Sequence, residues 1–195
     1  GALAEAADLR GVSEILMDLI LRPDWVTELL EICVEVAISF ARAQVESGAD
    51  IIGLGDAIAS QISPVMYRKF ALPYEQRIFA AVHELGALTR LHICGNSGPI
   101  VGDMVDSGAD IIDLDWMVDL GNAASEYGEQ CSFCGNFDPV AVMLKGTPEI
   151  VYDATMTCMQ LGGSRVISAA GCEIPDGTPH ENIQAQGQAL REFGA

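Results

Sequence analysis

Apolar positions along the chain follow two spacings, one typical of helices and the other typical of buried strands. Between residues 23 and 46 they recur every three or four positions, which predicts one long helix beginning at Pro23. The predicted apolar stripe of that helix is Trp25, Leu29, Ile32, Val36, Phe40 and Ala43. A short apolar run at 49–54 follows and predicts a strand.

This succession of helix, glycine and apolar strand continues to the end of the chain. The predicted strands are residues 49–54, 88–94, 109–114, 130–134 and 165–169, with a further strand remnant at 1–7. The other predicted helices are 63–85, 100–105, 121–127, 147–161 and 179–193. Alternating strands and helices with apolar strands indicate an α/β fold, in which a parallel sheet is wrapped in helices.

One hexapeptide, Ser-Gly-Ala-Asp-Ile-Ile, occurs twice, at residues 47–52 and 107–112. Each copy is predicted to end a helix with a left-handed glycine. Each is also predicted to start a strand that is buried on both faces.

Polar residues gather where the predicted strands end: Asp56, His92, Cys94, Asp113, Asp115, Asn136, Asp138, Cys172 and Glu173. In an α/β barrel these ends surround one mouth, where the chemistry takes place. No Gly-x-Gly-x-x-Gly run follows a strand, which disfavours a dinucleotide fold.

A closed barrel needs eight strands and about 250 residues. We therefore predict that residues 1–195 form one domain, the C-terminal portion of a (β/α)8 TIM barrel lacking its N-terminal strands. A self-contained five-stranded sheet is the alternative.

His92 and Cys94 are two residues apart, so a strand would direct both side chains to the same face. Imidazole nitrogen and thiolate sulfur are ligands that suit zinc. Alone, the pair also fits a buried cysteine beside a satisfied histidine. Cys172, next to Gly171 at another strand end, would supply a third donor if the fold brings the two ends together.

The net negative charge of the chain argues against two classes of binding partner, nucleic acids and anionic membranes. Ten Lys and Arg residues against 28 Asp and Glu residues give a net charge of −18. Nucleic-acid binding depends on basic groups, and anionic membranes would be repelled, so neither partner is expected. No apolar run approaches the roughly 18 residues that span a bilayer. The six scattered cysteines fit reduced thiols in a cytoplasmic protein.

Several motifs together carry a family resemblance: residues 59–60, 72–74, 91–95, 135–139, 146–149, 171–175 and 178–182. The chain resembles the uroporphyrinogen decarboxylase superfamily over nearly its whole length, most of all the branch of methylcobamide:coenzyme M methyltransferases. That branch carries a His-x-Cys…Cys zinc motif, and His92, Cys94 and Cys172 fall on it. The resemblance therefore implies that these residues are both zinc ligands and catalytic residues.

The predicted ligand set leaves zinc one position for an incoming thiol, which the cation would deprotonate. We predict methyl transfer from a methylated corrinoid such as methylcobalamin, delivered by a corrinoid protein, to a small thiol such as coenzyme M. Asp115 is predicted as a fourth zinc ligand that the thiol displaces, unless it caps a loop or orients His92. Asp56, Asn136 and Asp138 are predicted to bind substrate, with strand-end capping as the alternative for the last two.

Two other functions are also compatible with the sequence. One is a metal-free, decarboxylase-like lyase acting on a tetrapyrrole, and the other is a non-catalytic barrel that binds a corrinoid protein. Decarboxylases lack the His-x-Cys pair, and their arginine-containing N-terminal segment is absent from this chain, which disfavours the lyase. Cys131 and Cys134 are predicted on opposite strand faces, without a shared ligand role.

Overall fold

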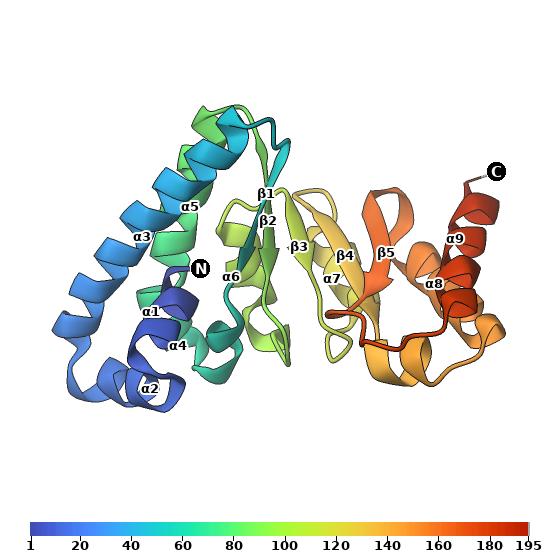
Figure 1. Ribbon diagram of the computed structural model, residues 1–195, viewed down its shortest axis with the longest axis horizontal. Helices are drawn as coiled ribbons and strands as arrows, with labels where there is room; N and C mark the ends of the chain where they lie inside the picture. The colour runs from blue at the N-terminus through green and yellow to red at the C-terminus, as the bar shows by residue number, and fades with distance from the viewer. Residues whose placement is uncertain (195) are drawn as a thin grey trace. The chain divides into compact units, whose positions relative to one another are not determined.

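The computed structural model describes residues 1–194, which form a five-stranded sheet with helices around it (Figure 1). The strand order is β1-β2-β3-β4-β5, so each strand neighbours the next one along the chain. The chain divides into two compact units, residues 1–93 with 99–111, and residues 94–98 with 112 onward. Within residues 1–194, no helix combines the length and the apolar character that crossing a membrane requires.

The first unit places helices α3 and α5 against strands β1 and β2. Its elements are α1 (Ala2–Arg10), α2 (Val12–Leu21), α3 (Pro23–Glu46), β1 (Ile51–Gly55), η1 (Ala57–Gln61), α4 (Pro64–Phe70), α5 (Leu72–Glu84), β2 (Leu88–His92) and α6 (Val101–Asp106). The short turn η2 (Gly98–Ile100) precedes α6. Strands β1 and β2 pair in parallel, with Gly53 opposite Arg90 and Gly55 opposite His92.

The second unit packs helix α8 against α9 and against strands β4 and β5. Its elements are α7 (Leu120–Tyr127), β4 (Ser132–Phe137), the π-helix η3 (Pro139–Leu144), α8 (Pro148–Gly162), η4 (Gly163–Arg165), β5 (Val166–Ala170) and α9 (His180–Phe193). Strand β3 (Ile111–Asp113) lies where the first unit passes into the second. Strands β4 and β5 also pair in parallel.

The five predicted strands and the α/β class are confirmed, whereas several element bounds are corrected. Residues 2–7, predicted as part of a strand remnant, belong to helix α1, and Ala2, Leu3, Ala6 and Ala7 are buried at helical spacing. Helix α2 was not predicted. Residues 63–85 form two helices rather than one, since Pro73 lies in the first turn of α5 and cannot donate a backbone hydrogen bond. Strand β2 ends at His92, so Cys94 belongs to the loop that follows.

Both copies of the repeated hexapeptide do what the sequence predicts at the helix ends. Gly48 and Gly108 have φ values of 100° and 84°, and strands β1 and β3 begin three residues after them. Burial on both faces is wrong for β1, however. Ile52 and Leu54 are buried, whereas Ile51, Gly53 and Gly55 lie on an exposed face.

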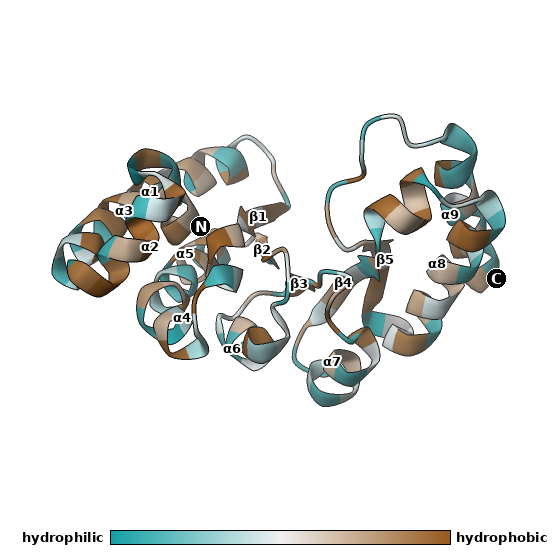
Figure 2. Cartoon of the chain, turned by 90° about the horizontal axis from the view of Figure 1, so that it is seen from below, coloured by the Kyte–Doolittle hydropathy of each residue, from teal (hydrophilic) through white to brown (hydrophobic). Residues whose placement is uncertain are grey.

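Helix α3 has the predicted bounds but buries a different stripe of residues. Ile32, Val36 and Phe40 of the predicted stripe are 61%, 63% and 64% exposed. The buried side is Val26, Leu30, Cys33, Val34 and Ala41. Figure 2 shows apolar positions distributed along this helix. Two stripes therefore satisfy the helical period, and packing against α1, α5 and β1 selects between them.

A buried cluster of acidic side chains joins α4, α5 and the end of β1. Tyr67 donates a hydrogen bond to Oε2 of Glu75, and the backbone N–H of Ala4 donates to Oδ1 of Asp56. Burial raises the pKa of Glu75 to about 8; the charge of Asp56 acts in the same direction, whereas the Tyr67 hydroxyl and the amino terminus lower it. Burial also raises the pKa of Asp56. At neutral pH, Glu75 is therefore largely protonated.

We expect Glu75 to make the stability of the chain depend on pH. Its pKa rises from about 4.3 in the unfolded chain to about 8 in the fold. The fold is therefore most stable below the unfolded pKa, where Glu75 is neutral in both the folded and the unfolded chain. This contribution to the free energy of unfolding is lost as the pH rises through the folded pKa. Relative to Glu75→Gln, the wild-type free energy of unfolding should fall by up to about 1.4 kcal/mol per pH unit in that window.

Urea unfolding of both proteins between pH 5 and pH 8 measures this difference. Glu28→Gln, at an exposed position of α3, is the matched control and should follow the wild type at every pH. If Glu75→Gln and the wild type lose stability in parallel, Glu75 ionises as an ordinary surface carboxyl does.

Candidate metal centre

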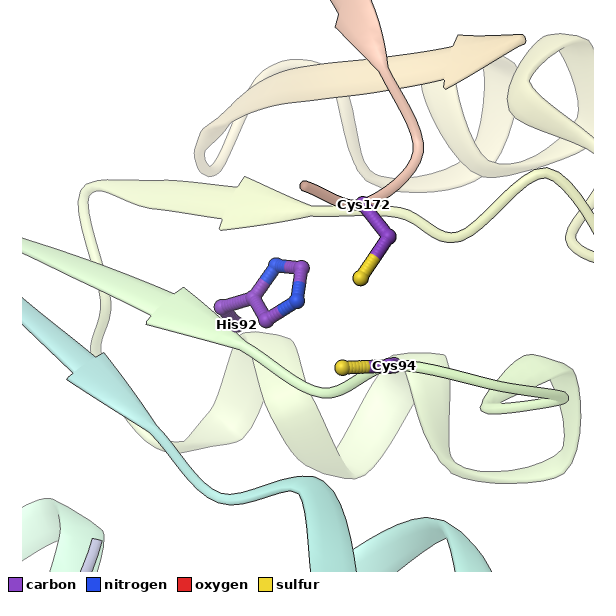
Figure 3. Close-up of side chains that lie close together, drawn as sticks. All are labelled: His92, Cys94 and Cys172. Atoms are coloured by element: carbon purple, nitrogen blue, oxygen red, sulfur yellow. The ribbon is translucent and has the colours of Figure 1, made fainter. Parts of the chain in front are cut away.

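Three side chains that could hold a metal converge in the structure (Figure 3). His92 is the last residue of β2, Cys94 lies two residues further along the chain, and Cys172 follows β5. Their ligand atoms all lie within 4.8 Å of one another, and each side chain is partly exposed. Among the described residues, these three form the one group of His, Cys, Asp or Glu side chains with at least three members close enough together to bind a metal ion.

The glycines beside the two cysteines fix the path of each loop. Gly95 follows Cys94 directly and has a φ of 84°, a conformation that favours glycine. Gly171 precedes Cys172, and its N–H donates to the carbonyl of Phe137 at 2.9 Å. A Cβ atom at Gly171 would lie 2.4 Å from the backbone nitrogen of Trp116. Both loops therefore need a glycine next to the cysteine that they carry.

Asp115 ties its own turn to the loop of Cys94. Its Oδ2 accepts a hydrogen bond from the N–H of Gly95 at 2.9 Å, and its Oδ1 accepts one from Met117 at 3.1 Å. The side chain is buried, with 4% exposed. Asp115 does not belong to the group of converging ligand atoms, so in this arrangement it acts on the loop backbone. Its predicted role as a fourth ligand would require it to release the Gly95 amide.

Without a metal, the surroundings of Cys94 favour the neutral thiol. Burial raises the pKa of Cys94 to about 11, and Cys172 contributes through a hydrogen bond and through its charge. The charge of Asp115 acts in the same direction. A divalent cation would reverse this preference, because it stabilises thiolate ligands.

The geometry and the donor types both fit zinc. In a tetrahedral site with Zn–S bonds of about 2.3 Å and Zn–N bonds of about 2.0–2.1 Å, neighbouring ligand atoms are about 3.4–3.8 Å apart. The observed upper limit of 4.8 Å requires the side chains to close by only about 1 Å. One imidazole and two thiols leave a fourth position, as in catalytic zinc sites.

The other predicted site residues have structural contacts. The side-chain amide of Asn136 donates to the carbonyls of Asp115 and Val118 at 3.0 and 2.6 Å, which holds the turn after β3. Asp138 caps η3, since its Oδ1 accepts from the two N–H groups at 140 and 141. Asp56 is 1% exposed and anchors α1. Substrate binding by these three residues stays a prediction.

The remaining cysteines and His83 lie outside the converging group. Cys33, Cys131, Cys134 and Cys158 are all buried. His83 is on the surface of α5, and its Nε2 lies 2.8 Å from Oδ2 of Asp110. That aspartate also accepts a hydrogen bond from the N–H of Thr89, which joins the last turn of α5 to β2.

Comparisons with known proteins agree with the family resemblance. The family model described as uroporphyrinogen decarboxylase (URO-D) matches residues 2–193. The methylcobamide:CoM methyltransferase MtbA of Methanosarcina mazei is 38% identical over 172 residues, which cover 87% of this chain and 50% of that protein. The uroporphyrinogen decarboxylase of Nocardia farcinica is 34% identical over 144 residues, covering 74% of this chain and 40% of that protein.

A solved structure shares the fold. It is described as a methyltransferase from Methanosarcina mazei, and it matches with a TM-score of 0.92 and 31% identity over 100% of this chain and 57% of that one. The chain thus spans about half the length of the relatives that it matches. The predicted fold class, part of a larger α/β barrel, is confirmed. Because the family model covers nearly every residue, the chain belongs to the uroporphyrinogen decarboxylase family.

Proposed function

We propose that this chain carries the metal centre of a zinc-dependent methyltransferase, which moves a methyl group from a methylated corrinoid to a thiol. The convergence of His92, Cys94 and Cys172 is the observation that carries the proposal. The similarity to methylcobamide:CoM methyltransferases supports it, since the name of those enzymes specifies both the methyl donor and the acceptor. We also propose that residues 1–195 act as one domain, the C-terminal portion of the family's barrel.

Each member of the centre has a defined task. His92, Cys94 and Cys172 would hold zinc, which lowers the pKa of a thiol that binds to it. The loop glycines and Asp115 keep the two cysteines in place. The acceptor thiol loses its proton to solvent, and a sulfur lone pair forms the new S–C bond. The cobalt–carbon bond of the corrinoid substrate breaks at the same time, and its electron pair stays on cobalt.

The fourth position is assigned to the acceptor, with Asp115 as the candidate to occupy it beforehand. In the structure both of its oxygens accept backbone hydrogen bonds. An exchange would therefore begin with release of the Gly95 N–H. Asp56, Asn136 and Asp138 are retained as candidates for contacts to the substrate. The proposed partners are a corrinoid protein and a small thiol, in the cytoplasm, where thiol ligands stay reduced.

Metal analysis and a methyl-transfer assay test this proposal. We expect about one zinc per chain, and loss of the methyl–cobalt absorption of methylcobalamin when 2-mercaptoethanesulfonate is added as acceptor. The methylated thiol should appear in equal amount by mass spectrometry. A metal-free protein with intact thiols would contradict the zinc site.

The second candidate is a decarboxylase-like lyase, because uroporphyrinogen decarboxylases are also relatives of this chain. It predicts carbon dioxide release from a tetrapyrrole carboxylate without any need for metal. The same preparation, assayed after treatment with a chelator, separates the two functions: the transferase should lose activity and the lyase should keep it.

A further inference from the structure

The turn at residues 115–118 touches both loops that carry cysteines of the metal centre. Towards Cys94, Oδ2 of Asp115 accepts a hydrogen bond at 2.9 Å from the N–H of Gly95, the residue after that cysteine. Towards Cys172, a Cβ atom at the preceding glycine would lie 2.4 Å from a backbone nitrogen of the turn. All of these residues belong to the second compact unit. The position of the turn therefore sets the positions of both cysteines.

The side-chain amide of Asn136 holds this turn at both ends. Its Nδ2 donates to the carbonyl of Asp115 at 3.0 Å and to the carbonyl of Val118 at 2.6 Å. The turn itself makes one hydrogen bond between the same two residues, from the N–H of Val118 to the carbonyl of Asp115 at 3.0 Å. Asn136 thus adds two side-chain hydrogen bonds to the one that the turn makes by itself.

The backbone of Asn136 is itself fixed by the sheet and by helix α8. It lies in β4 opposite Ala169 of β5, and its N–H donates to Sγ of Cys158 on α8 at 3.4 Å. An asparagine amide has two N–H donors, and the turn takes both of them. Asn136 therefore connects the sheet to the turn, and only its Oδ1 is left for another partner.

We propose that Asn136 is a positioning residue of the metal centre, acting through the turn at 115–118 to hold Cys94 and Cys172 at the spacing that one metal ion requires. This inference rests on the proposed function, and it gives Asn136 a task that is separate from contact with substrate. When the two amide hydrogen bonds are lost, the turn can move, and the loop of Cys94 moves with it through Asp115. Residues that orient metal ligands without touching the ion typically account for about ten- to hundredfold in metal affinity.

Asn136→Asp tests the inference, because it keeps the size of the side chain and replaces both N–H donors by an oxygen. We expect its zinc affinity to fall about ten- to hundredfold, and the cobalt–thiolate absorption bands of the Co²⁺-loaded protein to change. A variant that had only lost stability would keep the wild-type cobalt spectrum when folded. Asn136→Ser keeps one donor and should bind zinc with intermediate affinity, and it provides the same test if Asn136→Asp does not fold.

Asn182 offers a matched control in the same unit, because its amide makes the same kind of double contact at another place. Its Nδ2 donates to the carbonyls of Met143 and Gly146 at 2.8 and 2.9 Å. Asn182→Asp should therefore lose stability as Asn136→Asp does. Its zinc affinity and its cobalt spectrum should stay those of the wild type.

Phenylarsine oxide measures the spacing of the two thiols in the absence of zinc. The reagent reacts with two neighbouring thiols: two As–S bonds form, the two S–H protons leave with the oxygen as one water molecule, and arsenic keeps its oxidation state. Cys94 and Cys172 are partly exposed, whereas the other four cysteines are buried, so the reagent reports on this pair. We expect the wild type and Asn182→Asp to be bridged alike, and Asn136→Asp to bind the arsenical more weakly by a factor similar to that for zinc.

The two readouts separate the inference from the proposed function. An Asn136→Asp variant that keeps wild-type zinc affinity and arsenical binding overturns the inference, and so does an equal loss in Asn182→Asp. Arsenical binding that depends on Asn136 in a protein that binds no zinc would instead refute the proposed function alone.

Discussion

Replacing Cys172 by alanine should lower zinc affinity by at least about a hundredfold and abolish methyl transfer, while the fold persists. The change removes one of three protein ligands, and His92 with Cys94 alone cannot enclose the ion. Cys172 is partly exposed in the loop after β5, so its thiol fills no core space. The free energy of unfolding of the metal-free protein should therefore change by less than about 1 kcal/mol.

Competition with a chromophoric chelator measures the zinc affinity, and urea unfolding of the metal-free protein measures the stability. Cys33→Ala is the matched control, because it removes a buried thiol from helix α3. That variant should lose stability and keep its zinc, whereas Cys172→Ala should lose zinc and keep its stability. His92→Ala and Cys94→Ala should behave as Cys172→Ala does. Full zinc content and activity in Cys172→Ala would show that the site is elsewhere.

Gly171→Ala should also weaken zinc binding, although it changes no ligand. The added Cβ would lie 2.4 Å from the nitrogen of Trp116 and 2.9 Å from the carbonyl carbon of Asp115. Both are backbone atoms, so the loop that carries Cys172 has to move. We expect zinc affinity to fall at least about tenfold, and the free energy of unfolding to fall by about 1–3 kcal/mol.

Gly187→Ala is the control for the glycine change itself. Gly187 lies inside helix α9, and the nearest atom to its added Cβ is the flexible Nη1 of Arg191 at 3.5 Å. Alanine favours a helix interior over glycine by roughly 0.5–1 kcal/mol, so this variant should gain stability and retain zinc. Unchanged zinc affinity in Gly171→Ala would mean that the Cys172 loop has room to adjust.

Local patterns in the sequence were sufficient for the order and type of most elements. The bounds of α3, the two helix-ending glycines at 48 and 108, and the five strands follow from periodicity and from the preferences of single residues. These properties depend on neighbours within a few positions, so they can be read without knowledge of the fold. The pairing of His92 with Cys94 is local in the same sense.

Local patterns do not show which other elements a helix or strand will pack against. Helix α3 offers two apolar stripes, and only packing against α1, α5 and β1 shows which of them is buried. Asp115 was predicted either as a fourth metal ligand or as the cap of a loop, and in the structure its two oxygens accept hydrogen bonds from the backbone amides of Gly95 and Met117. Nothing in the sequence near Asp115 specifies that the N–H of Gly95 will be its partner.

By itself, the sequence determined most elements of this protein, the residue types of a candidate metal site and the family resemblance. The tertiary structure alone decided that Cys172 meets His92 and Cys94, and that Arg90 stands opposite a glycine. The physical reason is that hydrogen bonding and periodicity act over a few residues. Contacts between distant segments depend instead on strand register and on the packing of every element between them.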